Sequence, residues 1–180
     1  FSSHLISHGA EISRNDFSAR FNDEGSECML NGLFMIGDEQ LFDAHTMIDH
    51  AKPHCNSHEH YKGILQDKSR GVFNGKVMVR QDAQKTNAFQ ENNTILLSDD
   101  AVMNTKPQLE IFADDVKCSH GATIGKLNDE AKFYLKSRGI GEDAATAILI
   151  HAFASDVITS IKIPALRDYL EEIITKRFNQ

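Results

Sequence analysis

The chain has 180 residues, of which 41% are hydrophobic and 25% are charged, as is typical of a folded globular protein. Its formal net charge of −7 argues against a nucleic-acid partner, because such partners require a basic surface. No apolar run approaches the roughly 20 residues of a membrane-spanning helix, so we expect no membrane span.

Residues 1–126 are predicted to form a mainly β body, because runs of strand-forming residues alternate with turn residues. The expected strands are 28–34, 42–48, 60–65, 72–79, 94–97, 108–112 and 116–119. Two asparagine-containing pairs are also predicted to be turns: Asn74-Gly75, which interrupts 72–79, and Asn92-Asn93, which precedes 94–97. This pattern fits a sandwich, a barrel or a β-solenoid, and without a clean repeated motif it does not choose among the three.

Residues 127–180 change to helical periodicity and are predicted to form a C-terminal helical domain. Asn128 is expected to cap a helix that stops at Gly139, because Asn favours the N-cap and Gly the position after a helix. A second helix is expected over 142–161, and a third from Pro164 to residue 178.

The first group of possible metal ligands in chain order is His54, Cys55, His58 and His60. His58 and His60 are two residues apart, so on a strand they would face the same side and could share a metal. The spacing is not that of a helical HExxH site, and a structural zinc site normally has four ligands. The alternative interpretation is a polar loop that leads into a strand.

The glycines of residues 71–77 do not form a phosphate-binding loop. Three residues rather than four separate them, and Val77 stands where such a loop needs Ser or Thr. The segment also precedes a strand, so it lacks the helix N-terminus that would hold a phosphate. We therefore expect no nucleotide site in this chain.

Cys118 and His120 form a second group of possible ligands. Strand spacing places the thiol and the imidazole on one face, and both suit iron or zinc. Two ligands do not complete a site, so a functional site needs further ligands from elsewhere. The alternative is a buried cysteine beside a hydrogen-bonded histidine at a strand end.

The chain contains three cysteines, an odd number, and residues 1–11 lack the regions of a secretory signal peptide. Both features predict a reducing, cytoplasmic environment. Because residue 1 is not Met, we also expect a processed or truncated chain.

Six blocks follow one another along residues 60–140: YKGIL (61–65), SRGVFNGKV (69–77), AQKTNA (83–88), LLSD (96–99), KPQLEIFADDVKCSHGAT (106–123) and FYLKSRGI (133–140). Taken together, these blocks resemble the SufB/SufD family of iron–sulfur cluster assembly proteins. Gly121 after His120 resembles SufD, because SufB-like sequences tend to carry an acidic residue at that position.

The resemblance implies a fold and a role that periodicity does not supply. The fold is a right-handed parallel β-helix over residues 1–126 followed by the helical domain, with the N-terminal helical domain of the family absent. The role is a non-catalytic scaffold subunit of the SUF system. It pairs with SufB, or with a second copy of itself, and docks the ABC-type ATPase SufC.

The resemblance also implies where the functional residues lie. His120 and Cys118 would face the interface at which iron or an iron–sulfur cluster is held transiently, with no cofactor bound tightly by this chain alone. The expected SufC-docking residues lie in or next to the first helix: Lys132, Phe133, Tyr134, Leu135 and Arg138. The alternatives are a SufB-like subunit that holds the cluster more directly and a β-helix carbohydrate enzyme.

Overall fold

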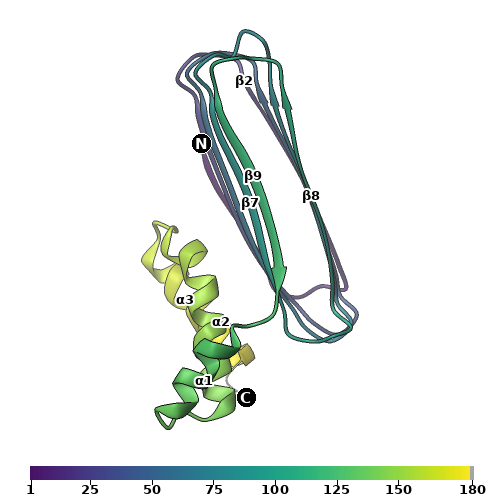
Figure 1. Ribbon diagram of the computed structural model, residues 1–180, viewed down its shortest axis with the longest axis vertical. Coiled ribbons are helices and arrows are strands. Elements are labelled where there is room, and N and C mark those ends of the chain that lie inside the picture. The colour runs from purple at the N-terminus through teal and green to yellow at the C-terminus, as the bar shows by residue number, and fades with distance from the viewer. Residues whose placement is uncertain (179–180) are drawn as a thin grey trace. The chain divides into compact units, whose positions relative to one another are not determined.

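The protein was studied as a computed structural model, which describes residues 1–178 and divides into two compact units, Phe1–Ile124 and a second unit that begins at Gly125. Within residues 1–178 the first unit is built from nine strands that lie in two sheets (Figure 1). The strands are β1 (Ser2–Ser7), β2 (Ile12–Phe21), β3 (Glu27–Ile36), β4 (Leu41–His50), β5 (Asn56–Leu65), β6 (Arg70–Val79), β7 (Asn87–Leu96), β8 (Val102–Ile111) and β9 (Lys117–Gly125).

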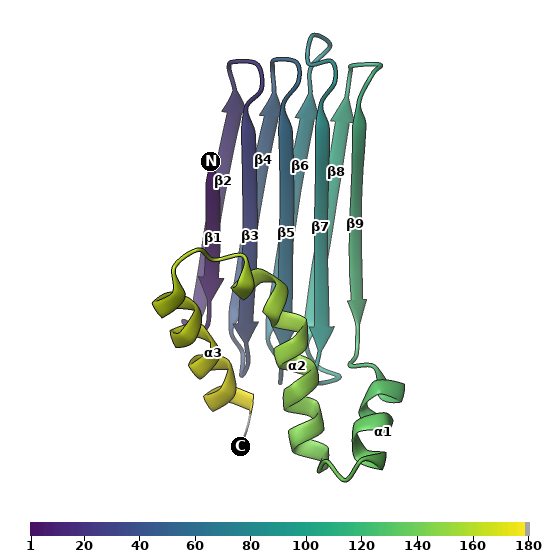
Figure 2. The ribbon, with the colours of Figure 1, turned by 90° about the vertical axis from the view of Figure 1, so that its left-hand side faces the viewer.

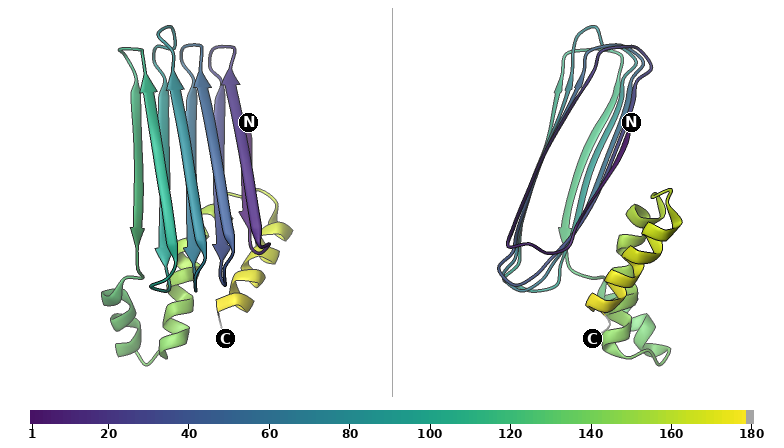
Figure 3. Two further views of the ribbon diagram at one scale, coloured as in Figure 1. Left: turned by 90° about the vertical axis from the view of Figure 1, so that its right-hand side faces the viewer. Right: turned by 180° about the vertical axis from the view of Figure 1, so that it is seen from behind.

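The two sheets form a parallel β-helix. One sheet has the order β1-β3-β5-β7-β9 and the other β2-β4-β6-β8, so the chain alternates between the sheets as it advances (Figure 2). Glu27 is aligned with Asn56, and Asn56 with Asn87, so one coil takes about 30 residues. Viewed end-on, the coils superpose (Figure 3, right). The solenoid is therefore confirmed over the sandwich and the barrel.

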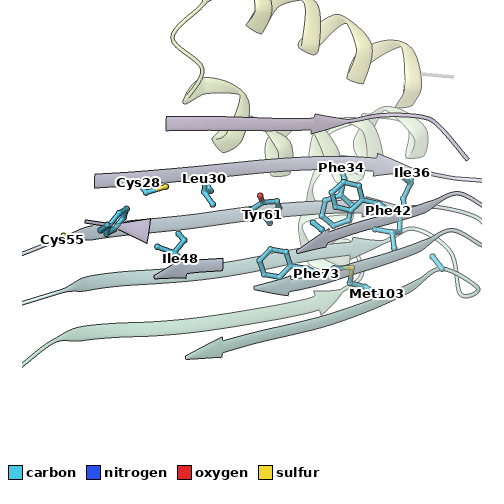
Figure 4. Close-up of a cluster of buried hydrophobic side chains, with 14 residues drawn as sticks. Cys28, Leu30, Phe34, Ile36, Phe42, Ile48, Cys55, Tyr61, Phe73 and Met103 are labelled. Carbon is cyan, nitrogen blue, oxygen red and sulfur yellow. The ribbon is translucent and has the colours of Figure 1, made fainter. Parts of the chain in front are cut away.

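Alternate side chains of each strand point into the space between the two sheets. In β6 the inward residues are Gly71, Phe73, Gly75, Val77 and Val79, all buried. Aromatic rings fill the centre (Figure 4): Phe34 stacks on Phe42 with 4.2 Å between ring centroids, and Tyr61 lies 4.8 Å from Phe73. Burying each such ring contributes about 2–3 kcal/mol, which a single isolated coil has no means to obtain.

One corner of the β-helix is built from left-handed residues that repeat from coil to coil. Gly25, His54 and Lys85 have φ values of 67°, 59° and 62° and precede β3, β5 and β7 in turn. The backbone N–H of His54 donates to Gln84 O at 2.9 Å, and that of Lys85 donates to Asp115 O at 2.7 Å. These hydrogen bonds hold two residues other than glycine in a conformation that such residues rarely adopt.

The structure corrects three expectations about the β body. The strands β1 and β2 were not predicted. The turns predicted at Asn74-Gly75 and Asn92-Asn93 are wrong, because these pairs lie inside β6 and β7. Gly75 faces the interior, where an added Cβ would lie 2.3 Å from Gln90 Nε2, and buried Asn92 donates from Nδ2 to Tyr61 O at 3.3 Å. Gly75 and Asn92 thus serve interior packing rather than chain reversal.

The second unit contains α1 (Asp129–Ser137), α2 (Glu142–Thr159) and α3 (Pro164–Phe178), which confirms the predicted helices. Asn128 caps α1, since its side chain accepts a hydrogen bond from Ala131 N at 2.9 Å, and Gly139 follows with a φ of 84°. α2 ends two residues before the predicted boundary and packs against α1 and α3. Among residues 1–178 no helix is long and apolar enough to cross a membrane.

Replacing Gly32 with alanine should destabilise the β-helix. Gly32 is aligned with Tyr61, and an added Cβ would lie 2.2 Å from the tyrosine ring, so the core must shift. We expect the free energy of unfolding to fall by about 1–3 kcal/mol, measured by urea denaturation. Gly121→Ala is the matched control, because nothing lies within 4 Å of a Cβ added there. Equal denaturation midpoints for the two variants would contradict the tight approach of Tyr61.

Candidate functional site

The end of the β-helix formed by β8 and β9 is exposed and carries two of the candidate ligands, Cys118 and His120. Within residues 1–178, β8 and β9 are the last strands of their sheets (Figure 3, left). Large apolar side chains stay exposed there: Ile111 by 41%, Phe112 by 62% and Ile124 by 46%. Edge strands also present backbone N–H and C=O groups that can pair with another chain.

Cys118 and His120 lie on the inner face of β9. Cys118 packs against the buried cluster that contains Val77 and Ala88, so its side chain faces the interior. His120 is two residues further along the same strand and therefore shares that face. The thiol is half-buried, whereas the imidazole is exposed. This end of the β-helix thus offers an accessible imidazole beside a partly covered thiol.

The three thiols differ in accessibility. Burial raises the pKa of the Cys118 thiol and that of Cys28, so both favour the protonated form, which is the poorer ligand. Cys28 is 1% exposed and Cys55 is 0% exposed. The Sγ of Cys55 lies 3.4 Å from the carbonyl oxygens of Asp23 and Pro53 and donates to them. Only Cys118 of the three is not enclosed in the core.

The group of His54, Cys55, His58 and His60 does not come together as one set of ligands. His54 occupies the left-handed corner before β5, and Cys55 lies in the core. His58 stacks on Phe89 with 5.1 Å between ring centroids, and His60 lies on the same outer face of β5. Within residues 1–178 no three His, Cys, Asp or Glu side chains are placed to hold a metal ion.

Sequence reasoning missed a polar row inside the β-helix. Glu59 of β5 and Gln90 of β7 are aligned neighbours, and each is 2% exposed. Gln90 Nε2 donates to Glu59 Oε2, and Thr46 Oγ1 donates to the same oxygen at 3.2 Å. Burial raises the pKa of Glu59 from 4.5 to about 7, although both hydrogen bonds favour the charged form.

Several oxygens along this interior lack a hydrogen-bond partner within residues 1–178. They are Glu59 Oε1, Gln90 Oε1, Asn92 Oδ1, Thr94 Oγ1 and Thr105 Oγ1. Gln90, Asn92 and Thr94 alternate along β7, a spacing that places them on one face. Polar residues such as these are typical of surface positions. Their alternation along residues 90–94 is the one sequence signal that could have placed Gln90, Asn92 and Thr94 on a shared face.

The five predicted docking residues of the helical unit differ in exposure and in contacts. Phe133 is 74% exposed and Tyr134 is 58% exposed, and the guanidinium of Arg138 lies 5.1 Å from the centre of the Tyr134 ring. Lys132, in contrast, pairs with Glu142 Oε1 at 2.6 Å and so links α1 to α2. Leu135 is half-buried. An aromatic–guanidinium surface therefore remains available on α1.

Comparison with known proteins identifies relatives across almost the whole chain. The family model described as "SUF system FeS cluster assembly, SufBD core domain" matches residues 1–153. The iron–sulfur cluster assembly protein SufD of Escherichia coli is 41% identical over 175 residues, which cover 97% of this chain and 41% of that protein.

Two further relatives come from a cyanobacterial strain and a plant. A SufBD family protein of Synechocystis is 38% identical over 172 residues, which cover 96% of this chain and 38% of that protein. The chloroplastic protein ABCI7 of Arabidopsis thaliana is 37% identical over 164 residues, with 91% of this chain and 34% of that protein covered. The chain thus spans about two fifths of the length of these curated relatives.

The raised pKa of Glu59 predicts a pH-dependent stability. The folded state holds the proton to higher pH than the unfolded chain, so Glu59 lowers the free energy of unfolding as the pH rises from 4.5 to about 7. The neutral amide of Glu59→Gln retains an acceptor oxygen. As the pH rises from 5 to 8, the free energy of unfolding of this variant should increase by about 2–3 kcal/mol relative to that of the wild type, measured by urea denaturation at each pH.

The control for this measurement is Glu91→Gln, which changes an exposed carboxylate one residue from Gln90, the aligned neighbour of Glu59. That variant should follow the wild-type pH profile. Parallel profiles for the wild type and Glu59→Gln would show that burial of Glu59 has no energetic effect.

Proposed function

The chain belongs to the SufBD family of the SUF system for iron–sulfur cluster assembly, and on this premise we propose that it acts as a non-catalytic scaffold subunit. In this role the β-helix pairs with SufB, or with a second copy of the chain, and the helical unit docks the ATPase SufC. The observation that carries the proposal is the exposed imidazole of His120 on the inner face of β9, the last strand of its sheet.

Pairing at this end of the β-helix is supported by the backbone groups and the apolar side chains that are exposed at β8 and β9. β8 and β9 end their sheets within residues 1–178, and parallel ladders continue when another strand is added. The exposed Ile111, Phe112 and Ile124 would lose contact with water in the same step. A second β-helix brought to this end would therefore satisfy both the backbone and the apolar side chains.

His120 is the stronger candidate to bind the cargo of this interface, iron or a nascent cluster. Its imidazole is exposed, whereas Cys118 is half-buried and has a raised pKa. Imidazole is a ligand for iron, and the thiol needs to lose its proton before it binds. Two side chains do not complete a coordination sphere, so the partner subunit supplies the remaining ligands.

Docking of SufC on α1 is supported by its surface composition. α1 contains no buried residue, and Phe133, Tyr134 and Arg138 form an exposed aromatic–guanidinium surface. Aromatic residues and arginine are the types most enriched at the energetic centres of protein interfaces. ATP hydrolysis in this assembly belongs to SufC.

The two other functions considered have less support. A SufB-like subunit needs further reactive cysteines, but Cys28 and Cys55 are both enclosed in the core. A β-helix glycosidase needs two carboxylates across one cleft. Two pairs of adjacent acids, Asp99-Asp100 and Asp114-Asp115, instead lie in the turns between strands.

Replacing His120 with alanine in the full-length protein should remove cluster formation without preventing assembly. The assay measures iron and sulfide in the SufB–SufC–SufD complex purified from cells, and co-purification reports assembly. We expect both contents to fall about tenfold or more, because a lost ligand has no replacement at the interface. His58→Ala, an exposed histidine on the outer face, is the control. Unchanged contents in His120→Ala would refute the assignment of His120.

Replacing Tyr134 with alanine should weaken SufC binding. The variant removes an exposed ring and its contact with Arg138, so we expect the dissociation constant for SufC to rise about tenfold or more. Isothermal titration calorimetry with purified SufC measures this change. Tyr169→Ala is the matched control, because Tyr169 is 55% exposed but lies on α3. Equal affinities of the two variants for SufC would refute the assignment of α1 as the docking surface.

A further inference from the structure

Three neighbouring strands place Glu59, Gln90 and His120 in one inward row. Glu59 is aligned with Gln90 in the ladder between β5 and β7. In the ladder between β7 and β9, Lys117 N donates to Thr86 O at 2.9 Å, and Thr123 Oγ1 donates to Asn93 Oδ1 at 2.5 Å. This register aligns His120 with Gln90, one strand spacing of about 4.8 Å away.

The amide of Gln90 is fixed in one orientation. Its Nε2 donates to Glu59 Oε2, which also accepts from Thr46. A reversed amide would set its oxygen against a carboxylate oxygen, with no hydrogen between them once Glu59 is ionised. Gly75 lies directly beside the amide, where even a Cβ would be 2.3 Å from Nε2. While Glu59 is ionised, Gln90 Oε1 is therefore held on the side away from Glu59.

Gln90 Oε1 is a buried acceptor without a partner within residues 1–178. Leaving such an acceptor unsatisfied costs about 1–3 kcal/mol, so a site of this kind favours a donor. His120 is the residue aligned with Gln90 on the strand that follows, and a neutral imidazole always carries one N–H group. The row thus offers an oriented acceptor to a ring that has a donor.

We propose that Gln90 is a positioning residue for His120. Its Oε1 accepts a hydrogen bond from one ring N–H of His120 and so fixes the tautomer and the direction of the ring. The other ring nitrogen then carries its lone pair toward the open end of the β-helix, where it binds iron or cluster cargo. The binding role of His120 rests on the proposed function, whereas the contact between Gln90 and His120 does not.

Nuclear magnetic resonance of the full-length protein, labelled with ¹⁵N histidine, tests the contact. In the wild type at pH 8, where Glu59 is mostly ionised, we expect a ring N–H signal of His120 that is protected from solvent and shows a nuclear Overhauser effect to the Gln90 side chain. His120→Gln identifies the signal by removing it. Gln90→Leu should abolish the protection, because it replaces the acceptor with an apolar group of similar size.

Asn92→Leu is the matched control. It also replaces a buried amide on the inner face of β7, but the register aligns residue 92 with Ala122. The protected signal should survive in this variant. If the wild type shows no protected N–H signal, or if the signal persists in Gln90→Leu, the proposal is overturned. If Gln90→Leu does not fold, the Overhauser effect in the wild type decides.

A second readout separates this proposal from the proposed function. In the SufB–SufC–SufD complex, Gln90→Leu should lower the iron content about tenfold, in line with the loss of a group that orients a metal ligand, and Asn92→Leu should not. If the N–H signal behaves as expected but His120→Ala leaves the iron content unchanged, the contact stands and the cluster-binding role of His120 fails.

Discussion

The parallel hydrogen-bond ladder between successive coils is the constraint on which the rest of the β-helix depends. The strands β2 to β8 each have ten residues, and each of β2 to β7 pairs with the strand one coil later, as Asn56 does with Asn87. A single coil has no partner for its inward side chains, so the core exists only when coils stack. The same stacking aligns side chains from different coils into rows along the interior. The polar row and the exposed histidine at its end are both consequences of that alignment.

Large side chains fit this narrow interior because glycines stand beside them. Tyr61 covers Gly32, and Phe34 covers Gly63, in each case within 2.5 Å of where a Cβ would stand. Gln90 fits over Gly75 in the same way. Interior packing and the orientation of the polar row thus share one device, a missing side chain on a strand beside or opposite the long side chain. Gly75, whose sequence context predicts a turn, instead leaves the space that the long side chain of Gln90 occupies.

The sequence predicted the helices well and the strands only in part. Asn128, Gly139 and Pro164 lie at helix ends, where capping and backbone preferences depend on only a few neighbouring residues. Such local preferences can be predicted from the sequence without knowledge of the fold. β1 and β2 were missed because they alternate many polar residues with few apolar ones. The repeat was hidden because the coil length varies, with Glu27 aligned to Asn56 but Arg70 to Val102. Glu59 and Gln90 are residue types that usually lie on the surface. Their burial follows from the stacking of coils, which the sequence pattern does not show.

The position of β9 at the end of its sheet sets the order in which the β-helix opens. In a linear array of coils, each stabilised by its neighbours, the terminal member frays first, so amide hydrogens of β9 exchange with solvent sooner than those of β5. The strand that carries Cys118 and His120 is thus, like β1 at the opposite end of the same sheet, released more easily than the internal strands. Addition of a neighbouring strand from another subunit turns it into an internal strand and slows that exchange. Under the proposed function, order in β9 would in this way report subunit association.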